Sequence, residues 1–111
     1  MDFIFDKKPT AVMIYGKSCE IPTKTAYFVD EANRIINAIA KAENALEAAR
    51  LTLDGIALYL GEDFVNEHFD RENIGEIDTD EIGALWIFLR NASAAATAEV
   101  LKKYAPAPIS R

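Results

Sequence analysis

The sequence predicts a predominantly helical α+β domain, in which an N-terminal β-hairpin or meander is followed by a long helix, a short helix and a C-terminal helix. Three observations lead to this fold class. A glycine turn joins two short β-like stretches, an apolar stripe runs through 28–60, and a second stripe follows a capping sequence at residue 78. The chain has 111 residues and is 50% hydrophobic, so it can form the core of one domain, which we place at 1–104.

The β-hairpin region is expected to occupy 1–22. Short stretches rich in β-branched and aromatic residues are predicted to be strands: 3–5, 11–15 and 18–21. Pro9 separates the first two stretches, and Gly16-Lys17 is the expected two-residue turn, because glycine adopts positive φ readily. Val12 and Ile14 fall on one face, which we expect to pack on apolar surface because an isolated hairpin is marginal in water.

One long helix is predicted for 23–60, with Thr23 or Thr25 as its N-cap. Its apolar stripe keeps gaps of four and three throughout: Phe28, Ala32, Ile35, Ile39, Ala42, Leu46, Ala49, Leu53, Ile56 and Leu60. An unbroken helix would be about 54 Å long, which exceeds the roughly 35 Å diameter of a compact domain of this size. Either the helix breaks, with Asp54-Gly55 as the expected point, or the molecule is elongated. We favour the continuous helix, with the stripe partly shared in a homo-oligomer.

The segment 61–78 is predicted to hold a short helix and an acidic loop. Gly61 is expected to end the long helix, and Asp63 is expected to cap a short helix over 64–69. The polar residues that follow are expected to form the loop.

The C-terminal helix is predicted over 79–104, because Asp78 and Glu81 have the spacing of a capping box. Its core stripe is expected to comprise Ile82, Leu85, Trp86, Leu89, Ala92, Ala96 and Val100. The proline-containing segment 105–111 cannot continue the helix and is expected to be a flexible tail.

Residues 84–89 are apolar on nearly every side, because Ile87 and Phe88 lie beside the core stripe. Such a segment is either enclosed between two layers or exposes apolar surface. Candidate partner-binding residues are therefore chosen here and on the short helix: Trp86, Ile87, Phe88, Phe64 and Phe69. For Trp86 a place in the core is the simpler interpretation, although tryptophan is enriched at the centres of interfaces.

Acidic residues are concentrated between Gly61 and Glu81, where nine acids accompany the single base Arg71. This window carries −8, and the rest of the chain carries +2, which gives the net charge of −6. The distribution argues against a nucleic-acid-binding surface. The simplest interpretation is a solvated loop, in which some of the acids lie at the start of a helix, where the helix dipole favours negative charge. A docking site for a basic partner, a cation site and a DNA mimic are the alternatives.

The twelve residues from Asp70 to Glu81 have the layout of a calcium loop, with Gly75 at position six. Position five, however, is Ile74, which has no side-chain oxygen, and no second loop accompanies this one. We therefore expect a polar connector without bound calcium.

Few residues in this chain are suited to catalysis or metal binding. Cys19 is the only cysteine and is expected to be a buried or half-buried structural thiol, and His68 is expected to be a surface or packing residue. No triad order, phosphate loop or paired histidine motif is present, so we expect neither an enzyme nor a cofactor. No apolar run of membrane-spanning length and no secretory signal is visible, so we expect a cytoplasmic protein with no membrane contact.

The order of motifs resembles the small tail assembly chaperones of siphophages and related prophages. The resemblance covers about 1–104 and depends on MDFIFDKKPT at the start, Gly16-Lys17, EIPT at 20–23, AYF at 26–28, LGEDFV at 60–65 and the helix with 86–89. It implies a hairpin followed by helices and a non-catalytic protein that acts in the host cell cytoplasm. Such a protein holds the tape-measure protein soluble, helps to recruit tail-tube subunits and is absent from the finished virion.

Two other functions remain open from the sequence. A small acidic inhibitor that mimics DNA would use the acidic window to block a nucleic-acid enzyme, and its binding would weaken steeply with salt. A self-associating helical scaffold would have no client. A chaperone, by contrast, would show weaker salt dependence and would lose binding on changes at Ile87 or Phe88.

Overall fold

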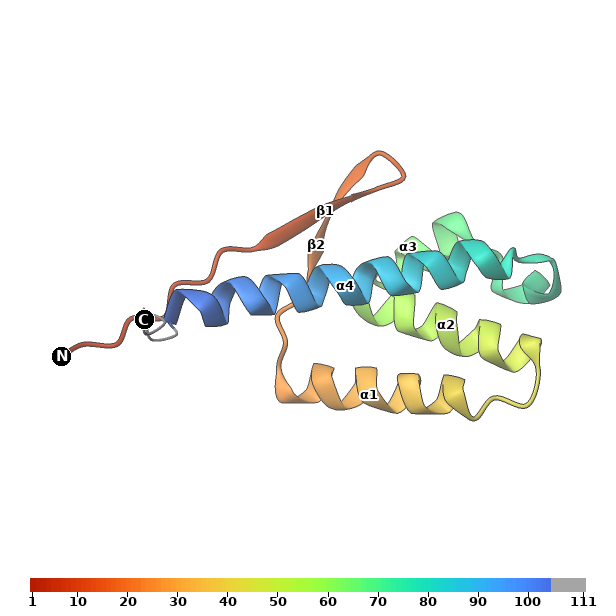
Figure 1. The fold of residues 1–111 in the computed structure, drawn as a ribbon. Helices are drawn as coiled ribbons and strands as arrows, with labels where there is room; N and C mark the ends of the chain where they lie inside the picture. The colour runs from red at the N-terminus through yellow and green to blue at the C-terminus, as the bar shows by residue number, and fades with distance from the viewer. Residues whose placement is uncertain (105–111) are drawn as a thin grey trace, which may run out of the picture.

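The computed structural model describes residues 1–104, and it confirms the predominantly helical α+β class (Figure 1). A two-stranded antiparallel hairpin precedes the helices. The elements are β1 (Thr10–Ile14), β2 (Lys17–Ile21), α1 (Ala26–Ala40), α2 (Ala45–Leu60), α3 (Glu62–His68), the 3-10 helix η1 (Arg71–Glu76) and α4 (Thr79–Tyr104). The predicted tail at 105–111 lies outside the described residues.

The hairpin forms where it was predicted, but its turn is Tyr15-Gly16 rather than Gly16-Lys17. Ile14 pairs with Lys17, and the two turn residues have φ of 49° and 79°. Positive φ at both central residues matches the right-handed twist of the strands, although it is uncommon for a tyrosine. Ile14 is 5% exposed and belongs to the hydrophobic core, so the prediction that its face packs on apolar surface is confirmed.

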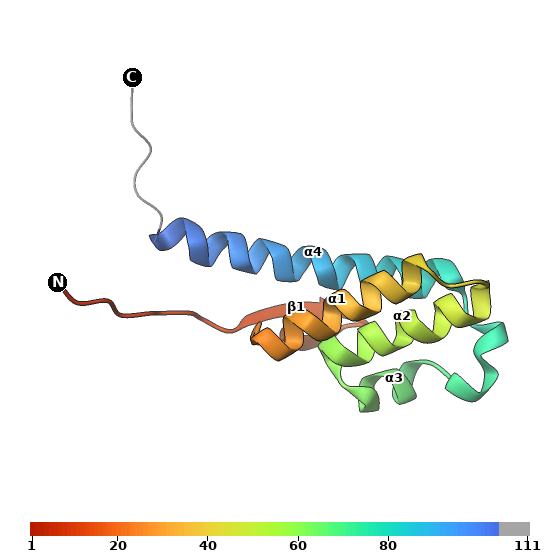
Figure 2. The same ribbon diagram turned by 90° about the horizontal axis from the view of Figure 1, so that it is seen from below.

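The predicted strand at 3–5 is wrong. Residues 1–9 form an extended arm with no strand beside it, and the arm runs beyond the α1–α2 pair (Figure 2). A strand requires backbone hydrogen bonds to a neighbouring strand. The arm is held instead by Tyr104 at the end of α4, whose ring lies 5.6 Å from that of Phe3 and 5.7 Å from that of Phe5.

The continuous helix predicted over 23–60 is also wrong, and so is the alternative break at Asp54-Gly55. The chain leaves the helix at 41–44, and Asn44 caps α2 by accepting a hydrogen bond of 2.9 Å from the Glu47 N–H. Thr25, one of the two predicted capping residues, is the N-cap of α1. Because α1 and α2 fold back side by side (Figures 1 and 2), most of the heptad stripe is covered within one chain. Burial of this stripe therefore does not require a second copy.

Helix α2 lies at the centre of the molecule. It contacts α1, α3, η1, α4 and β2, and its Leu53 and Ile56 are 0% exposed. Gly55 lies inside α2 and permits the close approach of Trp86, because a Cβ at this position would lie 2.5 Å from Cζ3 of the indole ring. The glycine therefore serves helix packing rather than a helix break.

The helix boundaries between α2 and α4 agree with the sequence in part. Gly61 ends α2 with φ of 94°, and its N–H donates to Ala57. Helix α3 begins at Glu62, so the predicted capping role of Asp63 is wrong, and part of the predicted loop is the helix η1. Asp78 accepts a hydrogen bond of 2.9 Å from the Asp80 N–H at the start of α4, as expected for a cap.

The molecule is elongated, with extents of 56 × 31 × 28 Å and a radius of gyration of 16.8 Å. A compact domain of this length has a radius of gyration of about 13 Å. The difference arises from α4 and the N-terminal arm, which run side by side beyond the α1–α2 pair (Figures 1 and 2). None of the helices in residues 1–104 combines the length and the apolar character needed to cross a bilayer.

Candidate functional site

Helix α4 has one buried face and one exposed face, and both are mainly apolar. The buried face packs on the core through Ile82, Leu85, Trp86, Leu89 and Ser93. The opposite face is exposed, and we define the outer seam as Ala84, Ile87, Asn91, Ala94, Ala98 and Leu101. Ile87 is 56% exposed and Leu101 is 64% exposed. Exposed helix faces are normally polar and charged, so the outer seam is a candidate interaction surface.

Charged residues are scarce on α4 between its two ends. From Ile82 to Leu101 the only charged residues are Arg90 and Glu99, in a chain that is 27% charged. The guanidinium of Arg90 lies 5.6 Å from the centroid of the Trp86 ring, so this side chain leans towards the body of the protein. The exposed side of α4 is therefore a nearly uncharged strip, with its charges at either end.

The structure separates the five residues selected from the sequence. Trp86 and Phe69 are 6% and 8% exposed and belong to the core, and Phe64 is half-buried. Ile87 is exposed, as is Phe88 at 46%. Only these two can meet a partner without rearrangement of the fold.

The half-buried Phe64 belongs to an aromatic cluster at the hairpin tip. The ring of Tyr15 lies 4.9 Å from that of His68, and the ring of Phe64 lies 4.4 Å from the same histidine. The Tyr15 hydroxyl donates a hydrogen bond of 2.7 Å to Glu81. Burial, the hydrogen bond and the negative charge of Glu81 raise the pKa of Tyr15 to about 12. This cluster fixes the hairpin to α3 and to the start of α4, and it confirms the packing role expected for His68.

Several acids of the 61–81 window form contacts within the chain. Arg71 donates hydrogen bonds of 3.0 Å to both Glu62 and Asp54, which ties η1 to α2. Glu67 pairs with Lys17 of the hairpin at 2.8 Å. Asp70, the first position of the predicted calcium-like loop, accepts a hydrogen bond from the backbone of η1. Within residues 1–104, no three acidic, histidine or cysteine side chains are grouped so that they could hold a metal ion.

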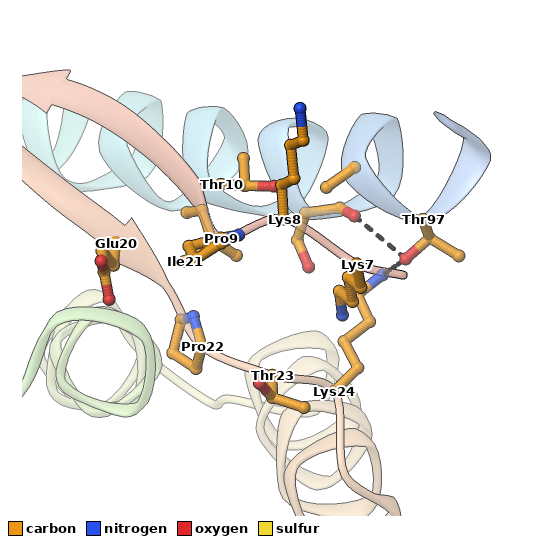
Figure 3. Close-up of a pocket in the computed structure, with 12 residues that line it drawn as sticks. Lys7, Lys8, Pro9, Thr10, Glu20, Ile21, Pro22, Thr23, Lys24 and Thr97 are labelled. Carbon is orange, nitrogen blue, oxygen red and sulfur yellow. Dashed lines mark hydrogen bonds between the residues drawn. The ribbon is translucent and has the colours of Figure 1, made fainter. Parts of the chain in front are cut away.

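A lysine-lined pocket of about 340 Å³ lies where the arm, β2 and α4 meet. Lys24 donates a hydrogen bond of 2.6 Å to Thr97, and Figure 3 shows Lys7 directed to the same place while Lys8 points away. Burial and the positive charge of Lys7 lower the pKa of Lys24. The pocket contains Glu20 as its only acid, so its electrostatics favour an anionic group.

The N-terminal arm is an exposed apolar segment, which the sequence pattern did not predict. Phe3 and Ile4 are each 73% exposed, and Phe5 is 56% exposed. The signal that could have revealed it is Pro9, which separates three apolar residues from the strand pair. Cys19 is half-buried, as expected for a structural thiol.

Comparisons with protein-family models, with curated proteins and with solved structures found no match to this chain.

Proposed function

We propose that this protein is a non-catalytic tail assembly chaperone of a siphophage or prophage, which holds the tape-measure protein soluble in the host cytoplasm and aids tail-tube assembly. The order of hairpin, helices and acidic segment in the sequence supports this reading by resemblance. The observation that carries it is the outer face of α4, where Ile87 and Phe88 are exposed on a nearly uncharged helix.

A chaperone that keeps an aggregation-prone helical protein in solution needs apolar surface of its own. The outer face of α4 offers a straight apolar surface on a helix about 39 Å long, which suits an amphipathic helix of the client. The acids of the 61–81 window keep the net charge at −6, and net charge of one sign opposes self-aggregation. Apolar contact surface and solubility are thus provided by different parts of the chain.

The acidic inhibitor is less well supported. Glu62, Glu67 and Glu81 each contact a side chain of the same molecule, and Asp70 and Asp78 accept backbone hydrogen bonds. A DNA mimic needs its carboxylates free to meet the basic groups of an enzyme. Here much of the acidic segment contributes to the fold.

Co-expression with the tape-measure protein encoded in the same genome tests the proposed function. We expect the tape-measure protein to remain in the soluble fraction and to co-purify with this chain. Phe88→Asp should abolish both effects while the far-UV circular dichroism stays unchanged, because Phe88 is exposed on α4. The matched control is Tyr27→Asp, which removes an aromatic side chain that is 79% exposed on α1.

Failure of the wild-type chain to capture the tape-measure protein would contradict the proposal. Capture of a nuclease or polymerase in a salt-sensitive manner would instead favour the acidic inhibitor. Equal loss of capture in Tyr27→Asp would show that the effect is not specific to α4.

A further inference from the structure

We infer that two copies of this chain pair through the outer seam of α4, with the two helices antiparallel about a two-fold axis. The inference rests on the proposed function for the role of this face, and it names a second copy as the occupant of the face before a client binds. In Figure 2, α4 forms one edge of the molecule, and α1, α2 and the hairpin all lie on the same side of it, while the residues of the outer seam are exposed. The seam is therefore open to another molecule along its length.

The outer seam has the spacing of a coiled-coil interface. Its residues succeed one another at gaps of three, four, three, four and three, and all are exposed. This periodicity keeps a narrow stripe on one side of a helix over many turns. The buried face of α4 has its own separate set of apolar residues, so the core does not explain the seam.

The sizes of the seam residues match when the helices run antiparallel. In the heptad notation of coiled coils, Ala84, Asn91 and Ala98 occupy a positions, and Ile87, Ala94 and Leu101 occupy d positions. In an antiparallel pair each a position faces a d position of the partner helix. Ile87 then faces Ala98 of the second copy, and Leu101 faces Ala84. Phe88, which flanks the seam, comes beside Ala95 of the other helix, which is also exposed. Each bulky side chain therefore meets a small one, which permits a close and even packing distance.

The charges at the ends of α4 favour the same direction. The helix begins with Asp80 and Glu81 and ends with Lys102 and Lys103. The antiparallel register brings the acidic start of one helix beside the basic end of the other, twice per dimer because of the symmetry. A parallel pair would instead set acids beside acids and lysines beside lysines. It would also place Ile87 against Ile87 and Ala84 against Ala84. The two bulky side chains and the two small ones would then require different distances between the helices.

Sedimentation velocity over a range of protein concentrations tests the pairing. We expect a monomer–dimer equilibrium for the wild type and a monomer for Ile87→Glu, with unchanged circular dichroism because Ile87 is outside the core. Tyr27→Glu, a change to an exposed residue of α1, should dimerise like the wild type. A wild type that is monomeric at every concentration would overturn the proposal, and so would an Ile87→Glu variant that still dimerises.

Cross-linking tests the direction of the helices. In a Cys19→Ser background, chains carrying Ala84→Cys are mixed with chains carrying Leu101→Cys and treated with a short bis-maleimide. We expect products that join the two kinds of chain. Products that join only chains of the same kind would indicate parallel helices and would overturn the antiparallel register.

Charge exchange supplies an independent check that leaves the apolar seam intact. Asp80→Lys and Lys102→Glu should each weaken the dimer several-fold, and the double variant should recover the wild-type dissociation constant. Asp80 is used because Glu81 accepts the hydrogen bond of Tyr15 within its own chain. Absence of this recovery would contradict the register.

Pairing and client binding can fail separately. A wild type that dimerises but does not capture the tape-measure protein leaves this inference standing and rejects the proposed function. A monomer that captures the client would reject the pairing and show that the client alone occupies the face.

Discussion

Single residues decide how closely the helices of this protein approach. Gly55 is the clearest case, because the ring of Trp86 occupies the space where any side chain would begin. Trp86 in turn meets Tyr59 edge to face, with 5.7 Å between the ring centroids. The contact between α2 and α4 therefore depends on the absence of one methyl group.

Gly55→Ala should destabilise the protein although alanine is the better helix former. The helix propensity gain is about 1 kcal/mol, whereas overpacking of a core typically costs about 1–3 kcal/mol. A Cβ at 2.5 Å from a rigid indole ring lies well inside contact distance, so we expect a lower free energy of unfolding in urea denaturation.

Gly83→Ala is the matched control for this prediction. Gly83 is also inside a helix, but nothing lies within 4 Å of the position of its Cβ. This variant should be more stable than the wild type by up to about 1 kcal/mol. If both variants were stabilised by the same amount, the close approach of Trp86 to Gly55 would not be the reason for the glycine at this position.

At the scale of elements, the β-hairpin is held along its inner face and at its tip. On the inner face, Ile14 joins the core, and Val12, Cys19 and Ile21 pack against it. At the tip, Tyr15 contacts His68 and Glu81, and Lys17 pairs with Glu67. A two-stranded sheet of this size is marginal alone, so these contacts position it.

Tyr15→Phe should make the free energy of unfolding less sensitive to pH in the alkaline range. The pKa of Tyr15 is raised from 10.0 to about 12, so its neutral form is the one that the fold favours. Its contribution is therefore fully present below pH 10 and is lost as the pH rises through about 12. Between these pH values we expect the difference in the free energy of unfolding between the wild type and Tyr15→Phe to shrink. Urea denaturation at several pH values measures this difference. A constant difference between the two proteins would contradict this account.

At the scale of the whole molecule, the core is concentrated around α2, and the far end of α4 lies outside it. Ile82 and Leu89 are 2% and 0% exposed, whereas Leu101 and Tyr104 are 64% and 38% exposed. The last turns of α4 are supported by the N-terminal arm, through hydrogen bonds between Asp6 and Tyr104 and an ion pair between Asp6 and Lys103. Exposed ion pairs of this kind contribute little to stability.

Hydrogen exchange should show this gradient along α4. In dilute solution we expect the amides of 98–104 to exchange on the order of 100-fold faster than those of 82–89, because local opening costs little where few apolar contacts hold the helix. If two copies pair through the outer seam, the amides of 98–104 should exchange more slowly as the protein concentration rises. Uniform protection of α4 at low concentration would contradict the gradient.

Local signals in the sequence placed most of the elements correctly. Gly61 and Asp78 are capping residues in the structure as predicted, and so is Thr25, one of two predicted candidates. Alternation placed Ile14 on the inner face of the hairpin. The candidate site was predicted only in part. The sequence identified an apolar excess at 84–89, but it did not show that Trp86 is covered while Ile87 and Phe88 are open.

The sequence by itself determined the fold class, the start of α4 and the position of the hairpin, because caps, turns and side-chain alternation act between near neighbours. Only the tertiary structure decided that the stripe through 28–60 folds back on itself, because the heptad spacing continues unbroken across the turn at 41–44. The same spacing would suit a long helix paired with another copy. The tertiary structure therefore also decided which apolar face remains exposed: once α1 covers α2, and α2 covers one side of α4, the outer seam is left to a partner.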